Sequence, residues 1–518
     1  MATPRNTFAL PLPTVPPMAM ATAKSLDPLP SVLPGTFGDK APIGEMKKVV
    51  SLVDRSTFDE FVYPRNELST RFQPAFKPYH NFTQESVVWS FSGSPAWGQR
   101  ITFSVPWPWQ GDFLNWIALR LKPASWLPPV AAGHLGPDRA DWVPLRAAEF
   151  WVWANSLGTA AIERAEMEVG GVVVESFSGD WLNVWNKTSH DVGGAAAFDD
   201  AVYASYAEPP PVSRFRVSDD GYVYCYLPFW FAKHVNTAFP LLSCSGPDTV
   251  RFHITLRPFK DVVRRIGTAA ECGETPLGST FTVRDYTFPF YKTETVTCNS
   301  TIPGFESADI VCGISNIDGG LREAYIHSPH EILTEPVVET DFAEPLKYVV
   351  NTGATDTIKV QLPLTVANGP IRQLFFFLRR KAAVQEWRDW NNYSATLRGE
   401  ADAVWNPTTP LLVRAQLQVG TAIWADEEER WWRASGDVLV PGGIRAYGNF
   451  IYVYNFAERP SEFSPSGSLN ASRADLRLNL TVAPPDGSAD GEWTVHVFLV
   501  GTNWMRFEKG LANWVFMD

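Results

Sequence analysis

Few residues in this chain have the types and the spacing that catalysis or metal binding requires. His327 and His330 lie three residues apart, but no further residues with metal-ligand spacing accompany them. The chain has none of the motifs GxxxxGK(S/T), GxGxxG, HExxH or GxSxG, which mark phosphate, dinucleotide, zinc and nucleophile sites. The sequence therefore predicts no catalytic, cofactor-binding or metal-binding residues.

One acidic segment resembles the start of a calcium-binding loop. Asp486, Ser488 and Asp490 have the spacing of the first ligands of an EF-hand loop, but the twelfth position is Val497, where a bidentate Glu is needed. The residues at 484–487, Pro-Pro-Asp-Gly, are typical of a turn, so we predict a hairpin tip between two strands.

A second acidic segment imitates a glycan-cleaving site. The run 426–429 lies beside Trp431 and Trp432, and paired carboxylates next to aromatic rings are typical of such sites. Consecutive residues on one loop cannot place two carboxylates on either side of a scissile bond. We therefore predict a solvated loop or a short helix here.

Asn-x-Ser/Thr sequons are the remaining candidates for chemistry, because N-glycosylation requires this tripeptide. In a chain of 518 residues several sequons arise by chance. The candidate N-glycosylation sites are Asn81, Asn186, Asn299, Asn392, Asn470 and Asn479.

The composition favours a protein with large subunit interfaces. The charged fraction is only 19%, whereas Trp (21) and Phe (33) are abundant, so apolar area exceeds what a monomer usually buries. The net charge is −12 without a basic cluster, which argues against direct nucleic-acid binding, because phosphate neutralisation dominates that affinity. The length is that of about two to four domains.

Cysteine usage and hydropathy exclude two classes of protein. The five cysteines are odd in number and contain no CxxC, so we predict free thiols in a reducing compartment rather than a disulfide scaffold. The best candidate for an apolar helix, 6–23, contains four prolines and predicts neither a transmembrane helix nor a secretory signal. The cysteines are Cys225, Cys244, Cys272, Cys298 and Cys312.

Most of the chain has the pattern of antiparallel β-sheet. Apolar and polar residues alternate in several segments, which indicates strands with one buried and one solvated face. Gly170-Gly171 supplies the positive φ that a tight hairpin needs, between the alternating run 166–169 and the β-branched run 172–174. The other alternating segments are 250–256, 358–364, 413–419, 476–482 and 493–499.

Segments without a strand pattern divide the chain into an N-terminal arm and two β-rich halves. Residues 1–45 are rich in Pro and Ala, which is typical of an extended arm or of disorder. A weak zone at about 260–285 divides the remainder into 46–270 and 271–518, without a strong sequence repeat between them. Each part is long enough for an eight-stranded double-sheet domain. We also expect long loops at 124–147, 187–220 and 290–325, and short helices near 181–185, 382–390 and 426–432.

A series of short motifs resembles the major capsid proteins of large double-stranded DNA viruses of eukaryotes. The most specific are Gly179-Asp180-Trp181-Leu182-Asn183, Leu227-Pro228-Phe229-Trp230-Phe231 and 465–475, which reads PSGSLNASRAD. The chain departs from the pattern in a longer N-terminal arm, in Val173-Val174-Glu175 after the hairpin, and in its last residues. The matching segments, collinear from about residue 67 onwards, are 79–82, 91–93, 97–98, 111–114, 162–186, 227–231, 238–241, 330–335, 368–375, 451–460, 465–475 and 503–512.

This resemblance implies an all-β fold of two tandem eight-stranded jelly-roll β-sandwich domains, with long loops and the N-terminal arm. It implies a structural protein without enzymatic activity, a homotrimer that forms a pseudo-hexagonal capsomer of an icosahedral shell. The implied partners are neighbouring capsomers and minor capsid, penton and cement proteins, with at most indirect contact to an inner membrane. The implied location is the virion, assembled in a cytoplasmic virus factory.

The residues themselves leave two alternatives open. A glycan-binding or glycan-cleaving β-sandwich would explain the Trp content and the acidic run, and it requires an exposed aromatic platform with facing carboxylates. A minor capsid paralogue of the same fold would differ from the major protein in copy number. On either capsid interpretation, Pro465-Ser466-Gly467 forms a turn, Arg473 pairs with Asp475 across it, and Phe229-Trp230-Phe231 is core.

Overall fold

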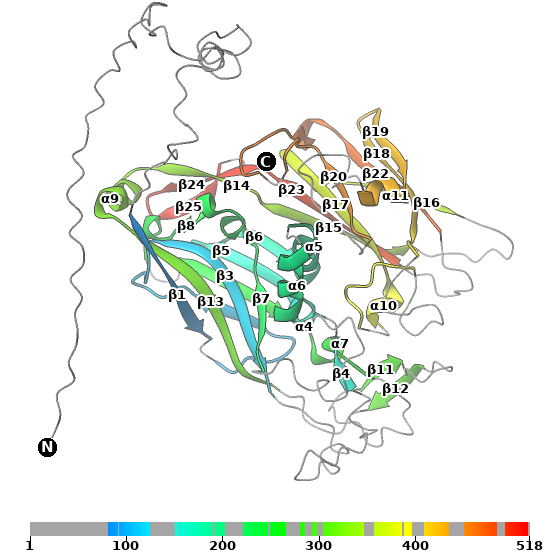
Figure 1. Cartoon of the computed structure of the whole chain (residues 1–518), viewed down its shortest axis with the longest axis horizontal. Helices are drawn as coiled ribbons and strands as arrows, with labels where there is room; N and C mark the ends of the chain where they lie inside the picture. The colour runs from blue at the N-terminus through cyan, green and yellow to red at the C-terminus, as the bar shows by residue number, and fades with distance from the viewer. Residues whose placement is uncertain are drawn as a thin grey trace, which may run out of the picture. The chain divides into compact units, whose positions relative to one another are not determined.

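The computed structural model describes residues 81–515 with gaps, the longest of which are 125–150, 203–220, 266–279, 396–408 and 435–449. Antiparallel strands dominate, and short helices lie between them (Figure 1). The predicted arm 1–45, the predicted hairpin tip 484–487 and Cys272, Cys298 and Asn299 lie outside the described residues.

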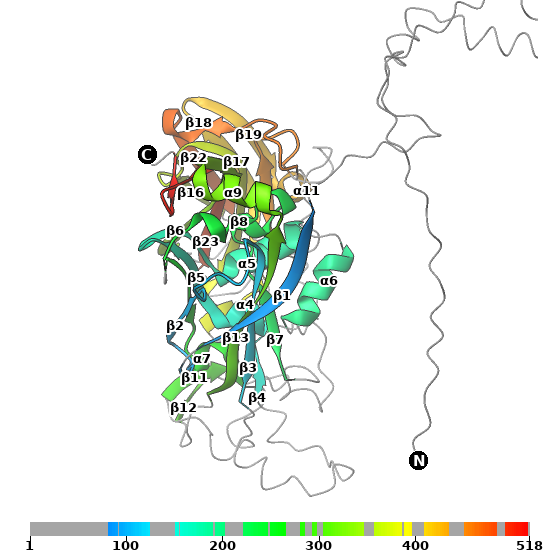
Figure 2. The ribbon, with the colours of Figure 1, turned by 90° about the vertical axis from the view of Figure 1, so that its left-hand side faces the viewer.

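The first half of the described chain contains a five-stranded and a four-stranded sheet. The first has the order β1-β13-β3-β7, with β8 also on β3, and the second has the order β2-β9-β5-β6. Figure 2 shows β2 and β5 on one side of this half and β1 and β7 on the other. The strands are β1 (Phe82–Ser90), β2 (Arg100–Ser104), β3 (Phe113–Pro123), β5 (Ile162–Val169), β6 (Val172–Ser178), β7 (Val223–Tyr226), β8 (Phe239–Pro240), β9 (Val250–Leu256) and β13 (Phe305–Ile317).

The second half repeats this arrangement. A five-stranded sheet has the order β15-β23-β17-β20, with β21 also on β17, and a four-stranded sheet has the order β16-β22-β18-β19. Strands β16, β18, β22 and β23 fall on the alternating segments of the sequence, which confirms those predictions. The strands are β15 (Val337–Leu346), β16 (Ile358–Pro363), β17 (Pro370–Arg380), β18 (Leu412–Val419), β19 (Ala422–Glu428), β20 (Tyr452–Asn455), β21 (Leu469–Asn470), β22 (Leu476–Val482) and β23 (Trp493–Gly501).

The two halves agree in register as well as in strand order. The β5–β6 hairpin turns at Gly170 and the β18–β19 hairpin at Gly420, and both glycines have φ of 60°. Gly170 N donates to Thr249 O, and Gly420 N donates to Asp475 O, each at 2.7 Å. Each hairpin has one irregularity at the corresponding step of its ladder. The chain therefore contains one structural unit twice, although its sequence shows no strong repeat.

Smaller sheets and helices complete the described structure. A three-stranded sheet has the order β14-β24-β25, and β4 pairs with β10 and β11 with β12. These elements are β4 (Trp151–Trp153), β10 (Val263–Arg265), β11 (Thr280–Arg284), β12 (Thr293–Thr297), β14 (His330–Thr334), β24 (Asn503–Glu508), β25 (Leu511–Trp514), α4 (Leu157–Ala161), α5 (Gly179–Ser189), α6 (Val192–Ala201), α7 (Phe259–Val262), α9 (Gly319–His327), α10 (Lys381–Gln385), α11 (Glu429–Ala434), η3 (Trp230–Ala232), η4 (Val235–Thr237), η5 (Leu241–Ser243) and η7 (Ala471–Arg473).

Aromatic side chains fill the core. Phe229 and Phe231 are fully buried and stack with ring centroids 5.9 Å apart, and both contact Phe252 of β9. Burial of a side chain of this size stabilises the fold by about 1.5–3 kcal/mol. The prediction that 229–231 is core is confirmed, although the segment leads into the 3-10 turn η3.

Two expected loops contain regular structure. The interval 290–325 holds β13 and α9, and 187–220 holds α6. The alternation of β13 is hidden in the sequence because Ser, Ala and Gly occupy many of its positions. Gly313 has to be glycine, since a Cβ there would lie 2.1 Å from Trp116 Nε1. Because β13 pairs with β1 and β3, the first set of sheets extends beyond residue 270.

Three finer expectations also change. Asp475 forms an ion pair with Arg477 at 2.5 Å, and not the predicted pair with Arg473. Asp475 directly precedes β22, and Arg477 is the second residue of that strand. The acidic run 426–429 lies mostly in strand β19, and α11 begins only at Glu429. The helix expected near 382–390 ends at Gln385. The helix expected near 181–185 is confirmed as α5.

Candidate functional site: the junction between the two halves

The segment Gly179-Asp180-Trp181 joins the two halves of the chain. It begins α5 directly after β6, and a Cβ at Gly179 would lie 2.3 Å from Thr159 O and 2.4 Å from Ile162 O. Only glycine allows this approach of the backbones. The next residues then face the second half of the chain, where Trp181 packs against Phe375 and Phe498 at ring-centroid distances of 5.7 and 5.4 Å.

Asp180 forms a buried ion pair with Arg379 at the end of β17. Its two carboxylate oxygens accept from Nη1 and Nη2 of Arg379 at 2.6 and 3.0 Å. Burial alone would raise the pKa of Asp180, but the Arg379 guanidinium holds it well below its usual range. Arg379 also donates to Trp390 O, and His496 Nε2 lies 3.3 Å from its Nη2. His496 in turn pairs with Asp341 at 2.6 Å.

The segment 388–395 of the second half docks on the helices of the first. Arg388 Nε donates to Lys260 O at 2.8 Å, and Trp390 Nε1 donates to Asp261 O at 3.0 Å. The guanidinium of Arg257 lies 3.7 Å from the centroid of the Trp390 ring. These contacts combine hydrogen bonds with a cation–π interaction, so they fix orientation as well as contact.

A second polar cluster crosses the junction near η3. Lys233 Nζ donates to Glu335 O at 2.6 Å, Glu335 forms an ion pair with the buried Arg372, and its carboxylate lies 3.3 Å from His234 Nε2. Burial lowers the pKa of Lys233 to about 8, and burial raises the pKa of Glu175 to about 7. A junction with this many buried charges tolerates little relative movement, because each movement would leave a charge unpaired.

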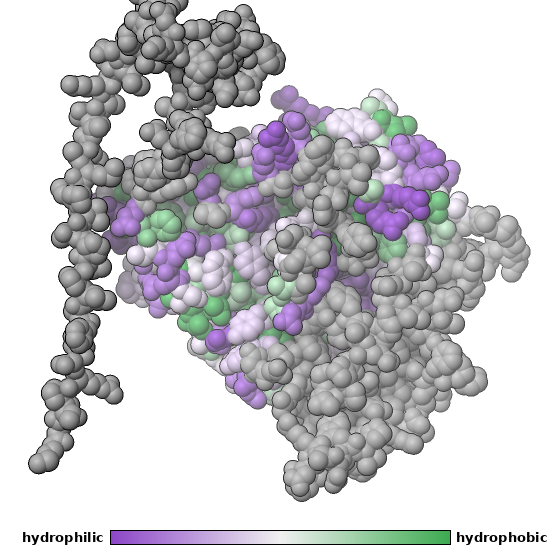
Figure 3. Space-filling view, viewed as in Figure 1, coloured by the Kyte–Doolittle hydropathy of each residue, from purple (hydrophilic) through white to green (hydrophobic). Residues whose placement is uncertain are grey.

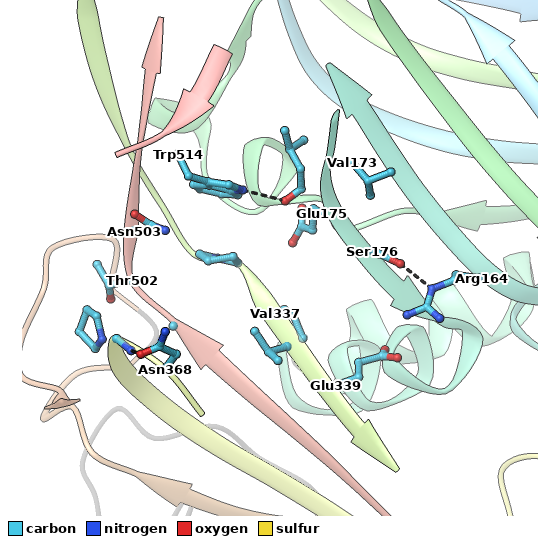
Figure 4. A pocket seen from close by; sticks show the side chains of 16 residues that line it. Arg164, Val173, Glu175, Ser176, Val337, Glu339, Asn368, Thr502, Asn503 and Trp514 are labelled. Atoms are coloured by element: carbon cyan, nitrogen blue, oxygen red, sulfur yellow. Dashed lines mark hydrogen bonds between the residues drawn. The ribbon is translucent and has the colours of Figure 1, made fainter. Parts of the chain in front are cut away.

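A cavity of about 450 Å³ lies between β6 and β15 at the junction (Figure 4). Glu175, Glu339 and Trp514 are among its lining residues. The carboxylate of Glu339 accepts hydrogen bonds from the N–H and the hydroxyl of Ser178 at 2.7 and 3.0 Å. Burial raises the pKa of Glu339 to about 7.

The predicted glycosylation residues differ in accessibility. Asn81 is exposed just before β1. Asn186 is fully buried in α5 and donates to Asp199, so the folded chain has no room for a glycan there. Asn392 is buried and accepts from Ser394. Asn470 is exposed but its side chain caps η7, and the half-buried Asn479 donates to Gln416.

The other chemical candidates of the sequence do not come together. His327 pairs with Glu323 on α9, whereas His330 stacks on Phe507. Trp432 is fully buried with its Nε1 bonded to Ala415 O, so it cannot serve as an exposed sugar platform. In the part of the chain that the structure describes, no group of His, Cys, Asp and Glu is arranged to hold a metal, and no helix is long and apolar enough to cross a membrane. The described cysteines Cys225, Cys244 and Cys312 are buried and free.

Exposed apolar side chains gather on strands at sheet edges. β1, β6 and β19 are each the last strand of a sheet. Hydrophobic patches alternate with hydrophilic ones on the described surface that faces the viewer in Figure 3. Exposed apolar edges are uncommon in monomers, because they pair with or pack against other chains. The exposed side chains are Phe82 and Val88 on β1, Val172 and Val173 on β6, and Ile423 and Trp424 on β19.

Comparison with known proteins finds similar capsid proteins, in agreement with the fold. The family described as "Major capsid protein N-terminus" matches residues 70–277. The major capsid protein of Pyramimonas orientalis virus is 22% identical over 467 residues, which cover 86% of this chain and 94% of that protein. The major capsid protein of Phaeocystis pouchetii virus is also 22% identical and covers 86% of this chain and 95% of its own length. Over most of its length the chain is similar to the major capsid proteins of large DNA viruses.

Solved capsid protein structures share the fold of this chain. The VP54 protein of PBCV-1, fitted into a reconstruction of the virophage Sputnik, has a TM-score of 0.61 at 17% identity, covering 87% of this chain and all of that chain. The Faustovirus major capsid protein has a TM-score of 0.58 at 11% identity, covering 90% of this chain and 97% of its own. The predicted fold, two tandem jelly rolls, is confirmed.

Several of the capsid-like motif residues lie at the junction or in the core, whereas most of the segment 465–475 is exposed. Asp180 and Trp181 are examples of the first group and Phe229 of the second. Sequence reasoning missed Arg379, the partner of Asp180, and Glu339, which accepts hydrogen bonds from Ser178. The adjacent Arg379-Arg380 at the end of an apolar strand was the available signal, because arginines buried there require partners.

Proposed function

We propose that three copies of this chain form a pseudo-hexagonal capsomer and that such capsomers tile the facets of an icosahedral shell. A hexagonal lattice requires six similar edges per building block. Three chains with two similar halves each supply six.

The observation that carries this proposal is the agreement of the two halves. The order β2-β9-β5-β6 recurs as β16-β22-β18-β19, and the second pair of sheets corresponds in the same way. Both halves also present exposed apolar residues on corresponding edge strands, Val173 on β6 and Ile423 on β19. The buried ion pair between Asp180 and Arg379 supports a chain that acts as one rigid block.

The remaining parts of the proposal concern the role of the protein in the particle. The chain serves as a building block of the virion, without catalysis and without direct contact to nucleic acid. Its partners are neighbouring capsomers and minor capsid, penton and cement proteins, with any membrane contact indirect, and assembly takes place in a cytoplasmic virus factory. The net charge of −12 supports separation from the genome.

We also propose a division of the chain into an arm, 1–45, and two jelly-roll domains. The predicted boundary near residue 270 needs one amendment, because β13 joins the first set of sheets. The chain passes to the second domain after Ile317, through α9 and β14.

Light scattering of the purified protein tests the oligomeric state. A trimer of the 57.7 kDa chain has a mass of roughly 173 kDa. A stable monomer at micromolar concentration would overturn the proposal.

A further inference from the structure

The junction cavity has walls of two chemical kinds. Val173, Val337 and the ring of Trp514 supply apolar surface, and Glu175 and Glu339 supply carboxylates (Figure 4). The volume of about 450 Å³ is that of a small-molecule site. Trp514 is held in place because its Nε1 donates to Val174 O at 3.1 Å.

The two carboxylates of the cavity are not neutralised by contact ion pairs. Within the described chain, neither Glu175 nor Glu339 has a basic nitrogen within 4 Å, whereas the neighbouring Asp180 and Asp341 pair with Arg379 and His496. The donors that Glu339 has among the described residues are the uncharged N–H and hydroxyl of Ser178.

Glu175 has unused hydrogen-bonding capacity at this cavity. Its side chain is 4% exposed, and Oε2 accepts from Trp230 N at 2.8 Å. Oε1 has no hydrogen-bond partner within the described residues, although the Val337 N–H is close enough to favour the charged form. A buried carboxylate oxygen without a partner is costly and indicates a missing donor.

The positive charges near the cavity are already engaged. Arg164 lines the cavity, but its Nε donates to Ser176 Oγ at 2.6 Å and lies 3.8 Å from Glu166. Lys233 donates to Glu335 O, and its charge is near enough to lower the pKa of Glu175 against the effect of burial. Among the described residues, an anionic ligand would therefore face two carboxylates, and the one guanidinium in the lining already donates to Ser176 and lies beside Glu166.

We propose that the junction cavity binds a primary ammonium group carried on an apolar stem, with Glu339 as the counter-ion, Glu175 Oε1 as a further acceptor, and Trp514 against the stem. The ammonium supplies a positive charge to pair with Glu339 and a donor for the Oε1 atom of Glu175. The apolar stem takes the place of water against Val173 and Val337. This site is independent of the capsomer geometry proposed above, so either proposal can fail alone.

Calorimetric titration of the full chain with 2-phenylethylammonium chloride at about pH 8 tests the site. We expect saturable binding of one equivalent. The neutral isostere 2-phenylethanol and the anion 3-phenylpropionate should bind at least about tenfold more weakly, because they lack the charge that Glu339 requires.

Two variants distinguish binding in the cavity from attraction of the ammonium by surface carboxylates in general. Glu339→Gln keeps the shape and should reduce affinity at least about tenfold. Glu331→Gln removes an exposed carboxylate of β14 that pairs with Arg506, outside the cavity, and should leave affinity unchanged. Equal affinity in wild type and Glu339→Gln, absence of saturable binding, or equal binding of the alcohol would each overturn the proposal.

The pH dependence of affinity in the wild-type chain tests the role of Glu339 without a variant that could misfold. Because burial raises the pKa of Glu339 to about 7, its carboxylate becomes protonated as the pH falls below about 7. The affinity for the ammonium should then decrease, with proton release on binding near pH 7. Affinity that stays constant between about pH 8 and pH 5.5 would contradict the role of Glu339.

The ammonium can come from a free amine or from a lysine side chain of a neighbouring copy, and titration of assembled shells distinguishes them. Binding by both dissociated and assembled protein assigns the site to a free amine. Binding by dissociated protein alone assigns it to a neighbouring chain.

Discussion

Asp180 and Arg379 are 199 residues apart in the sequence, and their side chains form a two-point ion pair that links α5 of the first half to β17 of the second. Both residues are buried, with 7% and 5% of their surface exposed. The motif residue Asp180 thus acts in the connection between the halves and not in a catalytic site.

Removal of the Asp180 carboxylate should destabilise the chain strongly. Asp180→Asn leaves the charge of Arg379 buried and unpaired, which costs about 3–5 kcal/mol in the free energy of unfolding. Urea unfolding followed by circular dichroism measures this loss. The control Glu331→Gln removes an exposed carboxylate and should change stability by no more than about 0.5 kcal/mol. Equal effects of the two variants would show that the buried pair is not important.

Truncation of Trp181 should open a cavity at the junction. Trp181→Ala removes the ring that packs on Phe375 and Phe498, and the expected loss is about 3–5 kcal/mol. Trp504→Ala, at a Trp that is 40% exposed, is the matched control and should have a much smaller effect. A similar loss of thermal stability in both variants would contradict the buried role of Trp181.

Gly179 should not tolerate a side chain. In Gly179→Ala the new Cβ would clash with two carbonyl oxygens at 2.3 and 2.4 Å, so the entry to α5 must shift and soluble yield should fall. Gly320→Ala in α9 meets nothing within 4 Å and should be neutral or stabilising, because Ala favours helix. The test compares the soluble yield and the thermal unfolding temperature of the two variants. Normal stability of Gly179→Ala would refute the close-approach argument.

Stability should decrease as the pH rises from about 4.5 to about 7. Burial raises the pKa of Glu175 and of Glu339 from 4.5 to about 7, so in this interval the folded chain binds protons that the unfolded chain has released. Urea unfolding at several pH values should show this slope, and Glu339→Gln should reduce it. A slope that is unchanged in the variant would mean that Glu339 does not titrate in this range.

Glycosylation, if the host applies it, should avoid Asn186. This side chain is fully buried and bonded to Asp199, whereas Asn81 is exposed. Glycopeptide mass spectrometry of the protein from virions measures occupancy at each sequon. A glycan on Asn186 in folded protein would contradict the packing of α5.

The sequence predicted the strands that alternate cleanly and the turn at Gly170, because period and turn chemistry are local properties. It did not predict β13, whose small residues mask the alternation and whose Gly313 is explained only by Trp116 on the neighbouring strand. The partners of Asp180 could not be predicted either. A pairing over 199 residues depends on how the two halves pack, and no local pattern records it.

Electron microscopy of the purified protein tests the central claim most directly, namely that the two equivalent halves let three chains build a six-edged block. The account predicts three-fold particles with a pseudo-hexagonal outline and six lobes of similar size. Monomeric particles, or trimers whose halves form two clearly unequal sets of edges, would contradict it.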